Sequence, residues 1–186
     1  MHTQVTPTGQ ERHFGAEEII VSKTDPKGVI RYANDVFCRI AGYPSAQLVG
    51  QPHNIIRHPD MPRGVFKFMW DTIGSGQEIF AYVNNLARDG ANYWVLAHIT
   101  PSFDAAGAIV GYHSNRRSPD PAAIAKVVPV YQRMAIEEKR HSRAIDAAAA
   151  SVDLLVGELS ELGQSYEQFV WGIITGQPKR GSSWAA

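Results

Sequence analysis

Hydrophobic and polar residues alternate in several short stretches over the first two thirds of the chain. A period of two is typical of β-strands. It predicts strands at 19–22, 29–32, 79–87, 92–103 and 108–116. Asp25-Pro26-Lys27-Gly28 lies between the first two strands, and Asp89-Gly90 and the segment 104–107 join the last three. These turn residues favour hairpins.

Helical spacing replaces the alternation between the second and third strands. Apolar residues from Val36 to Ala41 predict a short helix that Gly42 ends, and a longer helix starts near Pro62 and ends at Gly74. Prolines and glycines limit 43–56 to short helical turns. Two strands, short helices and then three strands predict an α+β fold, with a five-stranded antiparallel sheet, helices on one face and a ligand between them.

The C-terminal part follows a third pattern, a heptad seam with steps of three and four. The seam consists of Ile145, Ala148, Val152, Leu155, Leu159, Leu162, Tyr166, Phe169 and Ile173. It predicts an amphipathic helix that pairs with a second copy in a homodimer, or else folds back on its own core. Gly157, Gly163 and Gly172 each weaken such a helix, and a bend or break is expected near Gly163.

These patterns divide the chain into segments. Residues 1–18 show no apolar period and are expected to be loose, and 19–118 form a sensor domain. Residues 119–176 are expected to be a helical linker and a C-terminal helix for signalling or dimerisation, and 177–186 to be a flexible tail.

The amino-acid composition disfavours several classes of function. Lys and Arg number 18 and so do Asp and Glu, which disfavours nucleic acid as a partner. Cys38 is the only cysteine, so an internal disulfide and a cysteine zinc site are excluded. With no signal peptide and no stretch long enough to span a membrane, we expect a cytoplasmic protein. No catalytic motif is present, and we expect no enzyme activity.

One region carries sequence motifs that are far more specific to a protein family than these general patterns. It includes Tyr32-Ala33-Asn34-Asp35-x-Phe37, Gly42-Tyr43 and the run Gly50-Gln51-Pro52-His53-Asn54-x-x-Arg57-His58-Pro59-Asp60-Met61-Pro62. It continues through Met69-Trp70, Asn85, Tyr93-Trp94, Pro101, Gly111-Tyr112, Asp120, Pro129 and Tyr131. Over about residues 19–133 the chain resembles the PAS domain of bacterial aerotaxis receptors.

The resemblance implies a PAS fold that binds FAD and senses redox state or oxygen. The positions that would line or support the flavin site are Asn34, Arg57, His58, Asp60 and Asn85. Arg57 offers a fixed fork of donors to a pyrophosphate, and His58 adds a donor that can follow pH. The amides of Asn34 and Asn85 suit the pyrimidine edge of a flavin, and Asn85 is the candidate switch.

Two features depart from the receptors. Ile79 stands where they carry a tryptophan, which bears on the stacking contact with the flavin. The chain also lacks their membrane anchor and methyl-accepting domain, so the signal is expected to pass to a chemotaxis or kinase partner in trans.

Simpler interpretations remain open for single residues. Asp60 and Asn34 can be helix caps, and Arg57 can form a surface ion pair. Phe66, Met69 and Trp70 at helical spacing favour a core face. The histidines at 53, 58, 98 and 113 keep a haem- or metabolite-binding PAS sensor open, and a ligand-free dimerisation adaptor is a further alternative.

Overall fold

The structure, a computed structural model, describes residues 5–176. It divides into two units. The sheet unit contains residues up to 61 and 68–119, and the helical unit contains 62–67 and the residues from 120 onward. The division passes through helix α3 (Arg63–Gly74), whose first turn belongs to the helical unit.

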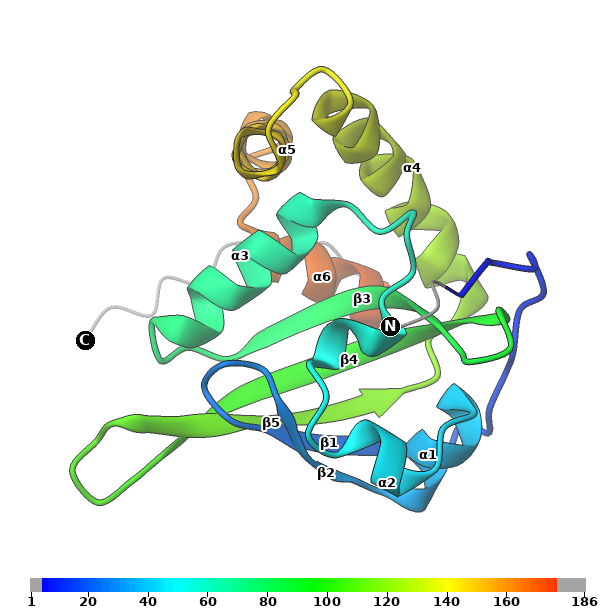
Figure 1. The fold of residues 1–186 in the computed structure, drawn as a ribbon. Coiled ribbons are helices and arrows are strands. Elements are labelled where there is room, and N and C mark those ends of the chain that lie inside the picture. The colour runs from blue at the N-terminus through cyan, green and yellow to red at the C-terminus, as the bar shows by residue number, and fades with distance from the viewer. Residues whose placement is uncertain (1–4, 177–186) are drawn as a thin grey trace. The chain divides into compact units, whose positions relative to one another are not determined.

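The sheet unit is built on five antiparallel strands (Figure 1). The strands are β1 (Ile20–Thr24), β2 (Ile30–Ala33), β3 (Ile79–Leu86), β4 (Asn92–Phe103) and β5 (Ile109–Arg117). Their order in the sheet is β2-β1-β5-β4-β3. Helices α1 (Asp35–Ala41) and α2 (Ser45–Leu48), the 3-10 helix η1 (His53–Ile56) and most of α3 complete the unit. The predicted fold class is confirmed.

The register of the strands defines the two faces of the sheet, because residues directly opposite each other point to the same side. The interior face carries a row of Ile20, Arg116, Ala97 and Ala81, all almost fully buried. The outer face carries the neighbouring row of Val21, Asn115, His98 and Phe80. Side chains from α1, η1 and α3 cover the interior face: Phe37 lies against Arg116, His53 against Ser22, and Trp70 against Tyr112.

Trp70 differs from its expected place in the core. Its side chain is 36% exposed and meets Tyr112 edge-on, with 5.4 Å between ring centroids. The indole fits there because Gly28 has no side chain: a Cβ at Gly28 would lie 2.9 Å from the Trp70 ring. Trp70 therefore closes the interior from the surface, whereas Met69 beside it is buried as expected.

The segment before β1 also differs from its expectation. Thr8 N donates to the Gly90 carbonyl over 2.8 Å, and Arg12 N donates to the Asn92 carbonyl over 2.7 Å. The Arg12 guanidinium pairs with Asp89, and Phe14 is buried. Residues 8–12 thus lie along the β3–β4 hairpin, held mainly by backbone bonds that leave no apolar period in the sequence. Residues 1–4 and the predicted tail at 177–186 lie outside the described residues.

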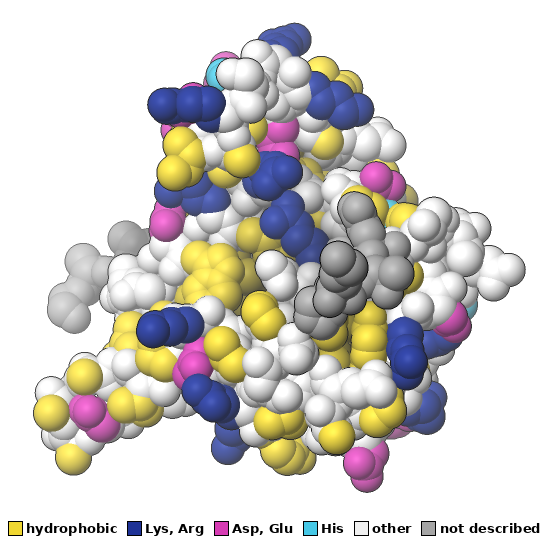
Figure 2. All heavy atoms as spheres, viewed as in Figure 1, with side chains coloured by type: hydrophobic (Ala, Val, Ile, Leu, Met, Phe, Trp, Pro, Cys, Tyr) yellow, Lys and Arg dark blue, Asp and Glu magenta, His cyan; other side chains and the backbone are white. Residues whose placement is uncertain are grey.

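The β4–β5 hairpin projects from the sheet in Figure 1 and carries apolar side chains at its surface in Figure 2. Phe103 and Val110, next to its turn, are each 51% exposed. On the face shown in Figure 2, basic and acidic side chains lie interspersed, in keeping with the balanced charge of the chain.

The helical unit contains α4 (Pro121–Glu138), α5 (Ala144–Glu161) and α6 (Tyr166–Thr175). The nine-position seam is divided between α5 and α6, so the expected break near Gly163 is confirmed. The break falls at Gly163, which has a φ of 64°. Within this unit α5 runs antiparallel to α4: Ser151 hydrogen-bonds Glu138, and Glu158 pairs with Arg133 over 2.7 Å. Leu155 and Leu159 of the seam are buried, while Ile145 and Leu162 are largely exposed.

Candidate functional site

The segment 57–61 is tied to strand β3. Arg57 and Asn85 form an isolated antiparallel bridge, and the Asn84 N–H donates to the Met61 sulfur over 3.4 Å. The Arg57 Nη2 donates to the Met61 carbonyl over 3.0 Å. Arg57 and Asn85, two of the predicted site residues, are therefore neighbours. The segment from Arg57 to the start of α3 is short and is held by its own hydrogen bonds.

His58 and Asp60 differ in burial. His58 is buried, and its Nδ1 accepts a hydrogen bond from the Asp60 N–H over 3.2 Å. Burial lowers the pKa of His58, against the smaller raising effect of the Asp60 charge. The Asp60 side chain is 89% exposed. Helix α3 starts at Arg63, and the interpretation of Asp60 as its cap stays a prediction.

Asn34 has a defined structural role. It is the N-cap of α1: its Oδ1 accepts from the N–H groups of Phe37 and Val21, each over 3.0 Å. Its Nδ2 donates to the Ile19 carbonyl over 2.8 Å. Asn34 follows β2 at one edge of the sheet, whereas Asn85 lies on β3 at the opposite edge. The structure therefore does not bring the two asparagines together.

Asn85 instead has two polar companions on the interior face. It lies directly opposite Tyr93 of β4, and Arg116 of β5 points to the same side of the sheet. All three are buried. The Tyr93 hydroxyl and the Arg116 Nε and Nη1 have no hydrogen-bond partner among residues 5–176. Buried polar groups are nearly always paired, so these atoms mark a place where a partner from outside the chain fits.

Arg116 is the most unusual member of this set. Its Nη2 donates to the Ser22 hydroxyl, and its guanidinium lies 4.5 Å from the centre of the Phe37 ring. Burial lowers the pKa of Arg116 to about 10, so the group stays charged at neutral pH. No carboxylate within the described part of the chain forms an ion pair with it. A buried cation without a counter-ion is costly.

His53 borders the same region. Its ring stacks on Phe37 with 5.9 Å between centroids, and its Nε2 lies 3.4 Å from the Ser22 hydroxyl. Although the residue keeps some surface exposure, burial of the ring lowers the pKa of His53 to about 3, and the Arg116 charge acts in the same direction. The imidazole is therefore neutral at physiological pH. Ile79, at the position where the aerotaxis receptors carry tryptophan, is buried on β3.

Tyr93 and Arg116 are not among the residues predicted for the site. Tyr93 fits the alternation of β4 as an ordinary core aromatic residue. Arg116 and Arg117 are adjacent, and the second half of β5 has no apolar alternation that would select one of them. Arg116 pairs with Ile20, which is fully buried, so Arg116 is the one of the two arginines that points into the interior.

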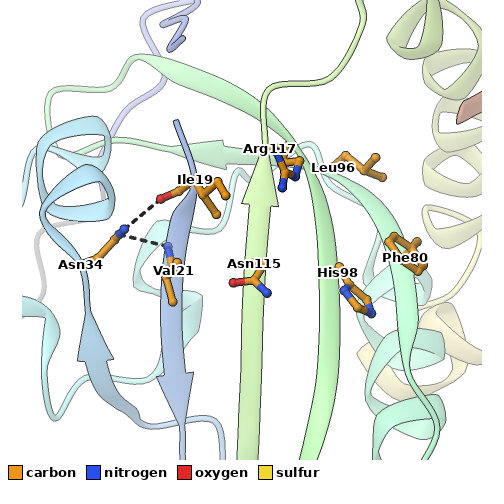
Figure 3. A pocket seen from close by; sticks show the side chains of 8 residues that line it. All are labelled: Ile19, Val21, Asn34, Phe80, Leu96, His98, Asn115 and Arg117. Atoms are coloured by element: carbon orange, nitrogen blue, oxygen red, sulfur yellow. Dashed lines mark hydrogen bonds between the residues drawn. The ribbon is translucent and has the colours of Figure 1, made fainter. Parts of the chain in front are cut away.

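A hollow lies on the outer face. It has a volume of about 350 Å³ and is lined by Ile19, Val21, Asn34, Phe80, Leu96, His98, Asn115 and Arg117 (Figure 3). The His98 ring stacks on Phe80 at 4.1 Å, and its Nε2 lies 2.8 Å from Glu78. Every donor and acceptor of Asn34 described above is directed to the backbone, and the other polar side chains that line this hollow are His98, Asn115 and Arg117.

The described residues show neither a metal-binding cluster nor a membrane-spanning helix. Within the described range, His, Cys, Asp and Glu side chains form no group of three that could hold a metal ion. No helix between residues 5 and 176 has both the length and the apolar character needed to cross a bilayer.

The interior face carries unpartnered donors from a guanidinium and a phenol, with the Asn85 amide on the same face. The ring of a flavin presents oxygen and nitrogen acceptors along its pyrimidine edge. Ala81 and Ala97 lie beside Arg116 in the same row and leave the middle of the sheet with small side chains. The donor set and these small side chains are both compatible with a planar, acceptor-rich ring.

Comparisons with known proteins agree with the fold. Residues 30–116 match the family model described as the PAS fold. The chain is 38% identical to the aerotaxis receptor of Escherichia coli (strain K12) over 127 residues, which are 68% of this chain and 25% of the receptor. It is 35% identical to the nitrogen fixation regulatory protein of Klebsiella pneumoniae over 99 residues, which are 53% of this chain and 20% of that protein.

Solved structures show the same architecture. The light-state structure of the blue-light photoreceptor Aureochrome1 LOV superposes with a TM-score of 0.54 at 23% identity, covering 61% of this chain and 91% of that one. The chain thus spans only a quarter or less of the curated relatives named above but nearly all of a solved domain. Together with the strand order, these matches establish that the chain contains a PAS domain.

Proposed function

We propose that this chain is a flavin-binding PAS sensor, which holds FAD over the interior face of its sheet and reports redox state or oxygen to a partner protein. The observation that carries the proposal is the set of buried, unpartnered polar atoms of Tyr93 and Arg116 beside Asn85. The similarity to an aerotaxis receptor supports the choice of FAD. The chain acts as a sensor and not as an enzyme.

The bound flavin supplies the redox chemistry, and the residues of the chain position and tune it. Asn85, Tyr93 and Arg116 hold the acceptor edge of the ring from β3, β4 and β5. Arg57 and His58, at the start of the segment that leads to α3, support the site from the side, and Arg57 serves the pyrophosphate. Asn34 supports it indirectly by fixing α1 to β1, and the exposed Asp60 lies at its margin.

The contacts of Asn85 give the signal a route. A change in the hydrogen bond that Asn85 makes to the ring acts on the Arg57–Asn85 bridge and on the Asn84–Met61 contact. Met61 is followed directly by Pro62 and α3. The first turn of α3 is held inside the helical unit, because the Gly64 N–H and the Ser151 hydroxyl both donate to the Glu138 carboxylate, over 2.9 and 2.8 Å.

The helical unit is the output. Its exposed seam residues, including Ile145 and Leu162, are available for a second copy or for a chemotaxis or kinase partner in trans. The division of the seam between α5 and α6 favours a short helical interface over a long coiled coil.

The absorption spectrum of the purified full-length chain tests this function. We expect a yellow protein with flavin bands, and release by heat followed by chromatography should identify FAD. Protein expressed with ample riboflavin in the medium removes limited supply as an explanation. A colourless protein that takes up neither FAD nor FMN would refute the proposal and favour a ligand-free adaptor.

Haem is a second candidate because of His53. A neutral imidazole packed beside the interior face is a competent iron ligand. The same spectrum separates the two cofactors, since haem gives a Soret band and flavin does not.

A further inference from the structure

Arg116 carries an inference about the charge of the ligand. The guanidinium lies in the middle strand of the sheet, 2% exposed, with two of its nitrogen atoms unpartnered and a single hydroxyl as its protein acceptor. Neither Phe37 nor neutral His53 can neutralise it. An arginine that served only the fold would have a carboxylate or several carbonyl groups around it.

We propose that Arg116 and Tyr93 form an anion-selective subsite for the pyrimidine edge of the bound flavin ring, so that the site prefers the reduced, more negatively charged form of the ring. This assignment rests on the proposed flavin function. Arg116 provides charge-assisted donors from Nε and Nη1, and the Tyr93 hydroxyl provides a neutral one. The charge of Arg116 acts on Tyr93, where it opposes the effect of burial on the tyrosine pKa, so the two groups sense each other.

The ring is a better occupant than the pyrophosphate. The subsite lies on the central strands β4 and β5, beside Ala97, and is closed to solvent. A doubly charged pyrophosphate would meet one guanidinium there and would leave charge uncompensated, whereas one cation matches the single charge that a reduced ring can carry.

The test uses the full chain with Arg116→Met, Arg116→Lys and the matched control Arg117→Met. Arg117 is the same residue type at the next position, but it is exposed on the outer face. Each protein is titrated with riboflavin and with FAD, and the midpoint potential of the bound flavin is measured. Arg116→Met should weaken both flavins about tenfold, and more for the reduced form than for the oxidised form. Each tenfold difference between the two forms lowers the two-electron midpoint potential by about 30 mV.

Arg116→Lys should keep part of the effect, and Arg117→Met should leave the affinity and the potential unchanged. Equal values for Arg116→Met and Arg117→Met would overturn the subsite. A loss confined to FAD would place a phosphate against Arg116 and overturn the assignment to the ring. Wild-type protein that binds no flavin would instead refute the proposed function.

Thermal unfolding of the ligand-free proteins distinguishes a role of Arg116 in flavin binding from a role in stabilising the fold. Since Arg116→Met removes a buried charge without a counter-ion, the ligand-free variant should unfold at a higher temperature than ligand-free wild type. A lower unfolding temperature would show that Arg116 supports the fold, and would contradict the subsite whether or not flavin binds.

Discussion

Replacing Gly64 with alanine is expected to destabilise the protein by about 2–3 kcal/mol, because the first turn of α3 lies directly against α5. A Cβ at this position would overlap the Ser151 hydroxyl and come within 3.1 Å of both Ser151 Cβ and the Val152 nitrogen. Rotating Ser151 removes only the first of these contacts and breaks its bond to Glu138. The measurement is urea denaturation followed by far-UV circular dichroism.

Gly157→Ala is the matched control, since it makes the same change within a helix of the same unit. Nothing lies within 4 Å of a Cβ at Gly157, so this alanine should stabilise α5 by about 1 kcal/mol. The double variant Gly64→Ala/Ser151→Ala should recover part of the loss because the hydroxyl is gone while the 3.1 Å contacts remain. Equal midpoints for Gly64→Ala and wild type would mean that α3 does not rest on α5, and the proposed signal route would lose its last step.

Acid should destabilise the protein through His53. In the folded protein the pKa of His53 is about 3, below its usual 6.5, so the folded ring stays neutral while the unfolded ring takes up a proton. The unfolded state therefore binds more protons below pH 6.5, and the free energy of unfolding should fall by about 1.4 kcal/mol for each pH unit lost down to that folded pKa. The effect is absent at pH 7 and above.

His53→Gln tests this prediction because it removes the titrating ring and keeps a polar side chain. Between pH 6 and pH 4 its stability should fall less steeply than that of wild type, with the remainder due to His58, whose pKa is also lowered by burial. His13→Gln, at a side chain that is 76% exposed, should behave as wild type. Parallel slopes for wild type and His53→Gln would show that His53 is accessible to protons in the folded state.

The sheet could be predicted from the sequence because each strand and turn is encoded locally. Alternation marked the strands, Gly28 and Gly90 marked the turns, and Asn34 and Gly42 marked the two ends of α1. The pairing of residues 8–12 with the β3–β4 hairpin could not be predicted, since its backbone hydrogen bonds depend on no particular side chain. The break of the C-terminal seam near Gly163 could be predicted, because glycine weakens a helix and tolerates the positive φ found there.

The candidate site was predicted only in part. Asn85 was identified through family resemblance, and its neighbour Arg57 likewise. Arg116 could not be predicted because inward and outward residues on β5 can be told apart only when the register with β1 is known, and Tyr93 looked like an ordinary core residue of β4. Asn34 was assigned a ligand contact, and the structure directs its amide to Ile19, Val21 and Phe37, where it organises α1.

The central claim is that the ligand lies on the interior face of the sheet, and one pair of variants tests it directly. Ala97→Leu adds volume beside Arg116 on the interior face, and His98→Leu changes the next residue, which lines the outer hollow. The measurement is the amount of FAD retained per chain after reconstitution and gel filtration, with far-UV circular dichroism to confirm folding. We predict that His98→Leu retains as much FAD as wild type and that Ala97→Leu retains none. Retention by Ala97→Leu with loss in His98→Leu would place the ligand on the outer face and contradict the account.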